Sequence, residues 1–234
     1  RGVARGSVET LSGTGRRGMS ESALRQELVD TAKAMSRSGL SPGRSGNVSA
    51  RFQDGMLITP SGLAYDAMGA SDTVLVGSDG SVAPGQRAPS TEWHFHLAAY
   101  RARPDMNALV HTHSLHATVL ACAGKSIPPF HYMVAVAGGS DIPVVPYATF
   151  GTPELAAHVA EGLRSRKACL MAHHGQVAMG TSLAAALELA HEVEVLSEQY
   201  FKVLSLGPPQ LLPETEMTAV LEKFKSYGRA AIED

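Results

Sequence analysis

Leu109-Val110-His111-Thr112-His113 is an apolar run that opens into a His-x-His pattern, and the interpretation of the whole chain starts from it. Such a run is typical of a buried strand. Because successive side chains of a strand point to opposite faces, His111 and His113 share one face and can point at one centre. Two imidazoles on the same side of a strand end are therefore candidate metal ligands.

A second histidine pair can complete this metal site. Catalytic zinc usually has three protein ligands and a further position for water or substrate, so His111 and His113 need a partner from elsewhere in the chain. The best donor is the pair His173-His174, which precedes Gly175 at the end of a second apolar run, 168–172. The two clusters together favour a metal site over unconnected histidines at strand ends.

Another His-x-His pattern, His94 and His96, falls in a predicted helix. Residues two positions apart in a helix point about 200° away from each other, so these two side chains are not expected to share a metal. The pattern therefore does not predict a second metal site.

Composition limits the class of protein. The 234 residues are 44% hydrophobic, which suffices for one sizeable domain. The 20 basic and 22 acidic residues nearly balance, with no basic stripe, so we expect no nucleic-acid partner. No apolar run approaches the ~20 residues of a membrane-spanning helix, so we expect no membrane partner. Cys122 and Cys169 lie in apolar surroundings, which predicts buried, reduced thiols in a cytoplasmic protein.

Hydrophobic periodicity and capping residues predict a mixture of helices and strands. Helices are predicted at 20–39, 90–100, 114–124, 152–164, 182–204 and 216–227, and strands at 48–52, 56–59, 73–76, 108–113, 168–173 and 176–179. Residues 1–18 are rich in Arg, Gly and Ser and show neither period. We expect them to form a flexible tail before a single domain of residues 19–234.

Glu92 lies at the start of a predicted helix that begins near the same loops. Its carboxylate can serve as a fourth metal ligand or as a general acid/base beside the metal. The alternative is a surface acid that interacts with the helix dipole, and for Glu92 taken alone this alternative is the more common one.

Three short polar loops have a composition that suits an anion. They combine small residues, backbone N–H groups and hydroxyl or amide donors, and one of them precedes a helix. These loops are Ser45-Gly46-Asn47, Ser61-Gly62 and Ser90-Thr91. Each alone is equally consistent with ordinary turn chemistry, and Arg44 can add positive charge to the first or simply be solvated.

A set of short motifs resembles one known family. The motifs are Ser-Gly-Asn-Val-Ser at 45–49, Leu-Ile-Thr-Pro-Ser-Gly at 57–62, Pro-Ser-Thr-Glu at 89–92, Val-His-Thr-His at 110–113, His-Tyr-Met at 131–133, Pro-Tyr-Ala-Thr-Phe-Gly at 146–151 and His-His-Gly at 173–175. Taken jointly they resemble the class II aldolase/adducin family, and more narrowly its branch that acts on L-fuculose 1-phosphate. The resemblance runs from about Ser20 to Tyr227.

The resemblance implies a fold and an activity. The expected fold is a single α/β domain of three layers, in which helices cover both faces of a mainly antiparallel sheet. The expected reaction is a zinc-dependent retro-aldol cleavage of L-fuculose 1-phosphate, or a close deoxyketose 1-phosphate, to dihydroxyacetone phosphate and L-lactaldehyde. One Zn²⁺ per subunit would be held by His111, His113 and His174, with zinc acting as Lewis acid.

The resemblance also implies roles for further residues. Glu92 corresponds to the family's acid/base, a role that we expect to need a raised pKa when the pocket closes. Tyr132 corresponds to a tyrosine that enters a neighbouring subunit's site, which implies a homotetramer. The phosphate of the sugar substrate would bind at Gly46, Asn47, Ser61, Gly62, Ser90 and Thr91, and the aldehyde side would be lined by Phe150 and Tyr227.

Other functions within and outside the family stay open. A rhamnulose- or 5-deoxyribulose-phosphate aldolase is the nearest alternative, and a methylthioribulose-phosphate dehydratase uses the same metal and loops. A pentulose-phosphate 4-epimerase generally lacks a Glu at position 92. An adducin-type head would be a non-catalytic binding module, which does not need the three histidines.

Overall fold

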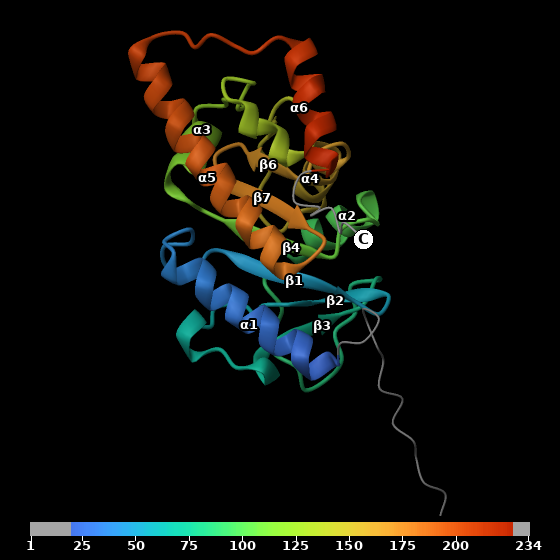
Figure 1. The fold of residues 1–234 in the computed structure, drawn as a ribbon. Coiled ribbons are helices and arrows are strands. Elements are labelled where there is room, and N and C mark those ends of the chain that lie inside the picture. Colours follow the sequence, from blue (N-terminus) through green and yellow to red (C-terminus); the bar gives the residue numbers. More distant parts are fainter. Residues whose placement is uncertain (1–19, 227–234) are drawn as a thin grey trace, which may run out of the picture.

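The computed structural model describes residues 20–226, and its seven strands form one sheet with the order β3-β2-β1-β4-β7-β6-β5 (Figure 1). All neighbouring strands are antiparallel except β5 and β6. This confirms the mainly antiparallel sheet. The strands are β1 (Asn47–Phe52), β2 (Gly55–Ile58), β3 (Val74–Val76), β4 (Ala108–Thr112), β5 (Val144–Val145), β6 (Ala168–Met171) and β7 (Gly175–Gly180).

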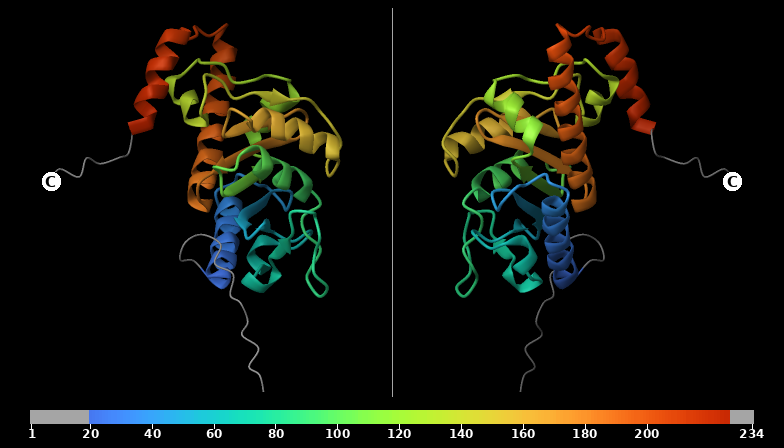
Figure 2. Two further views of the ribbon diagram at one scale, coloured as in Figure 1. Left: turned by 90° about the vertical axis from the view of Figure 1, so that its right-hand side faces the viewer. Right: turned by 90° about the vertical axis from the view of Figure 1, so that its left-hand side faces the viewer.

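Helices cover both faces of the sheet, as Figure 2 shows. One face packs against α1 (Glu21–Arg37), α3 (Leu115–Cys122) and α5 (Leu183–Leu206), whereas α6 (Glu214–Ser226) packs against the 3₁₀ helix η3 beside the same core. The other face packs against α2 (Trp93–Ala102) and α4 (Pro153–Leu163). The expected three-layer α/β domain is therefore confirmed. Short 3₁₀ helices occur at η1 (Tyr65–Ala67), η2 (Ala70–Asp72) and η3 (Tyr132–Ala137).

The alternation of side chains along β4 explains why the sheet has two cores. Leu109 packs into the layer of α2 and α4, whereas Ala108 and Val110 pack into the layer of α1 and α5. His111 has the same parity as Leu109 and therefore faces the α2 side. The central strand thus directs His111 to the side of the sheet that α2 and α4 cover.

Three of the described helices begin with a hydroxyl cap. The hydroxyl groups of Ser20, Thr152 and Ser182 each accept a hydrogen bond from the backbone N–H three residues later. Two other helices begin without such a cap. Helix α2 begins after Glu92 with no side-chain cap, and Ser114, at the start of α3, accepts a hydrogen bond from Gln176 instead of capping.

Other sequence-based expectations need correction or fall outside the described residues. Cys169 is buried as expected, but Cys122 is exposed at the end of α3. Strand β5 was not predicted, because two residues carry no usable period. The flexible tail of residues 1–18 and the aldehyde-pocket residue Tyr227 lie outside the described range. Within residues 20–226, no helix has the length and apolarity needed to cross a membrane.

Replacing Leu109 by Ala tests the central position of β4. Leu109 is fully buried, so we expect the cavity to lower the free energy of unfolding by about 3 kcal/mol in urea titrations. The matched control is Leu206→Ala at the end of α5, where the side chain is 89% exposed and the change should stay within about 0.5 kcal/mol. Equal losses in the two variants would contradict the assignment of β4 to the core.

Candidate active site

The pairing of β4 with β7 brings three histidines together. His111 lies on β4, His113 follows β4, and His174 ends the turn that leads into β7. In this register Thr112 lies opposite Gln176, so the two chain segments meet at one edge of the site. One ring nitrogen from each of His111, His113 and His174 lies within 4.8 Å of the others. The group therefore has the size and donor type of a metal site.

The turn between β6 and β7 decides which histidine of the pair enters this cluster. His173 has a positive φ of 55°, an uncommon conformation for a residue other than glycine. This conformation turns its ring toward Tyr147, with the ring centres 5.9 Å apart. The next residue, His174, then points at His111 and His113, at 4.9 Å between ring centres in each case.

Gly175 allows β7 to approach the end of β4. A Cβ atom at this position would lie 2.3 Å from the carbonyl oxygen of Thr112 and 3.0 Å from the ring of His113. The first contact is too short to exist, and the oxygen cannot move aside because it belongs to the backbone of the neighbouring strand; the second would require the His113 ring to shift. Any larger residue would separate the strands that carry the three histidines.

His111 is held in one tautomer. Its Nδ1 lies 2.8 Å from the backbone carbonyl oxygen of Gln176, which can only accept, so Nδ1 carries the hydrogen. The Nε2 of a neutral His111 then presents a lone pair to the cluster, 3.1 Å from Nε2 of His113. The Gln176 side chain is fixed in turn by Ser114 and by the carbonyl of Ala190. Such outer contacts are typical of metal-binding histidines.

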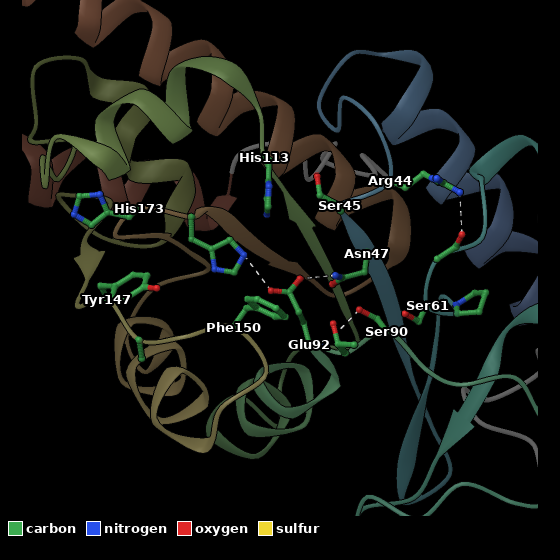
Figure 3. A pocket seen from close by; sticks show the side chains of 16 residues that line it. Arg44, Ser45, Asn47, Ser61, Ser90, Glu92, His113, Tyr147, Phe150 and His173 are labelled. Atoms are coloured by element: carbon green, nitrogen blue, oxygen red, sulfur yellow. Dashed lines mark hydrogen bonds and ion pairs between the residues drawn. The ribbon is translucent and has the colours of Figure 1, made fainter.

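Glu92 is buried beside the three imidazoles. Its Oε2 lies 3.2 Å from Nε2 of His111, and its Oε1 lies 3.0 Å from Nε2 of His174. The amide of Asn47 donates a hydrogen bond of 2.8 Å to Oε2, which Figure 3 shows as a dashed line. The carboxylate is thus 6% exposed and aimed into the cluster rather than placed on the surface as a helix-capping acid.

The histidines around Glu92 set its electrostatic environment. Burial alone would raise the pKa of its carboxyl group, but His111 and His174, in the state in which their rings carry a proton toward Glu92, outweigh burial and hold this pKa below its ordinary value. The raised pKa is expected when the pocket closes around a substrate, and it stays a prediction. For His113, burial and the neighbouring histidines lower the pKa to about 3, so its imidazole is neutral near pH 7.

The donor set fits a divalent metal ion. Three imidazole nitrogens and a carboxylate converge, and Oε1 of Glu92 is buried without a hydrogen-bond donor although it lies close to His174. Lone pairs that face one another repel unless a cation lies between them. His111, His113 and His174 would hold such an ion, with Glu92 adjacent, in the three-ligand arrangement typical of catalytic zinc.

A pocket of about 330 Å³ opens beside the histidines, and all the loop residues that the sequence singled out line it. In Figure 3 the polar loops lie on one side of Glu92, and Tyr147 and His173 lie on the other. Phe150 lines the pocket as well, and Tyr147 is an additional wall residue that the sequence analysis missed. The residues on the polar side are Arg44, Ser45, Gly46, Asn47, Pro60, Ser61, Gly62, Ser90 and Thr91.

The polar loops offer side-chain donors more than backbone donors. The N–H groups of Gly46, Ser61 and Ser90 are already bonded to Ser41 and to the carbonyls of Ala88 and Thr59. These three N–H groups are therefore not free for an anion, contrary to the expectation from composition. Hydroxyl groups, the Asn47 amide and the Arg44 guanidinium provide the alternative donors in this part of the pocket.

Tyr132 lies away from this pocket. It is the first residue of η3 and is 51% exposed. It borders a separate cavity of about 590 Å³, which is also lined by Met133, by Leu212 before α6 and by Val220 on α6. The structure of the single chain therefore does not bring Tyr132 to the histidines. Its exposure leaves the ring accessible to another molecule.

Comparisons with known proteins agree with this geometry. Residues 26–201 match the profile of the family described as class II aldolase and adducin N-terminal domain. The chain is 52% identical to a 5-methylthioribulose-1-phosphate/5-deoxyribulose-1-phosphate aldolase of Rhodospirillum rubrum, over 88% of this chain and 93% of that protein. It is 49% identical to an L-fuculose phosphate aldolase of Escherichia coli K12, over 90% of this chain and 98% of that protein.

A solved structure shows the same fold. An L-fuculose 1-phosphate aldolase superposes with a TM-score of 0.85 at 38% identity, covering 92% of this chain and all of that one. Because the match covers 92% of this chain, it spans most of the described helices and strands.

Neighbouring substitutions at His174 and His173 test the metal site. We expect His174→Asn to weaken zinc binding by more than about 100-fold, because loss of outer partners alone costs about 10- to 100-fold. His173→Asn should retain zinc, since this ring lies outside the cluster and Asn tolerates a positive φ. Competition with a zinc-binding dye measures both affinities. Equal losses, or zinc retained by His174→Asn, would contradict the assignment.

Proposed function

This chain belongs to the class II aldolase and adducin family, and we propose that it cleaves a ketose 1-phosphate to dihydroxyacetone phosphate and a short aldehyde. The observation that carries the proposal is the position of Glu92, which contacts His111 and His174 at the inner end of a pocket with polar donors on one side. The residues proposed as metal ligands, acid/base group and anion donors thus lie around one cavity.

We propose L-fuculose 1-phosphate as the first substrate and zinc as the metal, one ion per subunit. The likeness to fuculose-phosphate aldolases in sequence and fold supports this substrate. A second candidate is 5-deoxyribulose 1-phosphate or its methylthio analogue, because a relative named for these substrates is 52% identical. All three share the 1-phosphate half and differ in the aldehyde half.

The phosphate of the substrate would bind at the polar side of the pocket. Among the described residues that line it, Arg44 is the only arginine or lysine, and it donates a hydrogen bond to the carbonyl of Gly62. A guanidinium beside several hydroxyl groups suits a phosphate dianion. Gly46, Asn47, Ser61, Gly62, Ser90 and Thr91 complete this proposed subsite.

The bond that breaks joins carbons 3 and 4 of the sugar. A divalent ion held by the three histidines supplies a Lewis acid for the substrate's oxygens. Glu92 lies against the proposed metal ligands as a carboxylate, so it must receive a proton before it can protonate carbon 3. The 4-hydroxyl loses a proton as the aldehyde forms, and we propose that Tyr132 of a neighbouring subunit relays this proton toward Glu92. The proton lost by the 4-hydroxyl then supplies the proton that carbon 3 gains.

This role of Tyr132 requires an oligomer, and we propose a homotetramer. Tyr132 is half exposed and remote from the pocket of its own chain, which supports action on a partner. Phe150 lines the pocket, and we propose that it borders the aldehyde half together with Tyr227. We also propose a cytoplasmic location, which the two unpaired cysteines support.

An assay for dihydroxyacetone phosphate tests the proposed reaction. We expect release from at least one of L-fuculose 1-phosphate, rhamnulose 1-phosphate, 5-deoxyribulose 1-phosphate and 5-methylthioribulose 1-phosphate. A chelator should abolish the activity, and added zinc should restore it. Loss of water without cleavage would favour the dehydratase, epimerisation would favour the epimerase, and no reaction with no bound zinc would favour the binding module.

Replacing Glu92 by Gln tests the acid/base role. We expect the variant to keep its metal but to exchange the carbon 3 proton of dihydroxyacetone phosphate with deuterated water at least about 100-fold more slowly. The matched control is Glu194→Gln, which alters a partly buried carboxylate that contacts α3 outside the pocket. Exchange followed by proton NMR should be normal in the control. Undiminished exchange in the Glu92 variant would refute the role.

A further inference from the structure

A line of buried polar side chains leads from Glu92 into the layer between β1 and α2. Asn47 donates to Glu92 at 2.8 Å, Nε2 of His96 lies 2.5 Å from Oδ1 of Asn47, and Oγ of Ser49 lies 2.7 Å from Nδ1 of His96. We name these three side chains the Glu92 support. Tyr100 contacts its far end, at 2.8 Å from Ser49.

The support arises from a match between helix and strand spacing. Glu92, His96 and Tyr100 recur every four residues and so lie on one face of α2, about 6 Å apart along the axis. Asn47 and Ser49 are alternate residues on one face of β1, about 6.6 Å apart. Because the two spacings are nearly equal, the side chains of α2 and those of β1 remain opposite one another. This spacing is present in the sequence, but the His94-x-His96 pattern by itself raises only the question of metal binding.

The directions of these hydrogen bonds follow from the chemistry of the groups. Asn47 uses its amide N–H toward Glu92, so its carbonyl oxygen must accept from Nε2–H of His96. Nδ1 of a neutral His96 then accepts from the Ser49 hydroxyl, and Ser49 accepts from Tyr100. Every donor points toward the carboxylate, and each side chain has one orientation.

Burial keeps the ring of His96 neutral, as these hydrogen-bond directions require. His96 is fully buried, and burial lowers its pKa to about 3, so the ring is neutral with a single N–H. Burial also raises the pKa of Tyr100, which keeps its hydroxyl as a donor. An amide such as Asn47 does not pass a proton along, so the line fixes orientation and does not conduct protons.

We infer that His96 is a positioning residue for the aldol chemistry: through Asn47 it holds the carboxylate of Glu92 in the pose that faces the three histidines. This inference rests on the proposed acid/base role of Glu92. Without the N–H of His96, the Asn47 amide can turn its oxygen toward Glu92, where the two oxygens repel each other. The carboxylate then leaves its position, although every residue that contacts substrate or metal is still present.

Two substitutions at His96 test this inference. His96→Met removes the N–H while filling most of the space, and we expect kcat to fall about 10- to 100-fold with KM changed less than about twofold. His96→Gln keeps an N–H donor near the position of Nε2 and should restore most of kcat. Zinc content should equal that of the wild type in both variants. Ser49→Ala, which frees the other ring nitrogen, provides a smaller change if His96→Met does not fold.

The matched control is Tyr100→Phe. It removes a hydrogen bond in the same layer and should lower the melting temperature, yet it leaves all bonds of the Glu92 support intact. We expect its kcat to stay near that of the wild type. A merely structural role of His96 predicts that His96→Met and Tyr100→Phe lose activity in proportion to stability, and this result would overturn the inference.

Crystal structures of the variants separate this inference from the proposed function. In His96→Met, or in Ser49→Ala where His96→Met does not fold, we expect the Asn47 amide to rotate and Glu92 to lose its 2.8 Å contact with Asn47. In Tyr100→Phe both should stay in place. If Glu92 keeps its position in the variant that is solved, His96→Met or Ser49→Ala, the positioning role is overturned, and this holds whether or not the protein cleaves sugar phosphates. A wild-type protein that cleaves none of the four substrates overturns the proposed function instead.

Discussion

The pairing of β4 with β7 is the constraint on which the candidate site depends. It places His174, which is far from His111 and His113 in the sequence, at the same sheet edge, and Gly175 makes the close approach possible. Pairing of β4 with β1 on its other side brings Asn47 opposite His111. Three strands that meet at their ends thus supply the histidines and the amide that orients the carboxylate of Glu92.

A buried carboxylate among imidazoles is unstable unless its charge is balanced. Removing Glu92 from water costs several kcal/mol, and the surrounding histidines and Asn47 offset this cost in part. A divalent cation held by the three histidines would complete the balance and would supply positive charge to the pocket. The same charges that stabilise the site therefore prepare it for a reaction in which negative charge develops.

The pocket divides into two halves of different character, and this division fits a substrate with a constant and a variable part. Hydroxyl, amide and guanidinium groups converge on one half, whereas Tyr147 and Phe150 stand exposed at the other. Oriented polar donors select a phosphate strongly, but an aromatic wall distinguishes a methyl from a methylthio group only by ~1 to 3 kcal/mol. Family members that share the polar half can therefore differ in the aldehyde that they release.

The sequence by itself determined the helices, most of the strands and the candidate residues, because periodicity, caps and motifs are local. Spacing alone left His173 and His174 equivalent, and only the family resemblance favoured His174; in the structure a backbone turn with positive φ at His173 decides between them. Nor could the sequence give the pKa of Glu92 or the role of His96, which depend on neighbours from β1, β4 and the β6–β7 turn. Tertiary structure decided these properties, because electrostatic and hydrogen-bonding partners are set by distance in space and not along the chain.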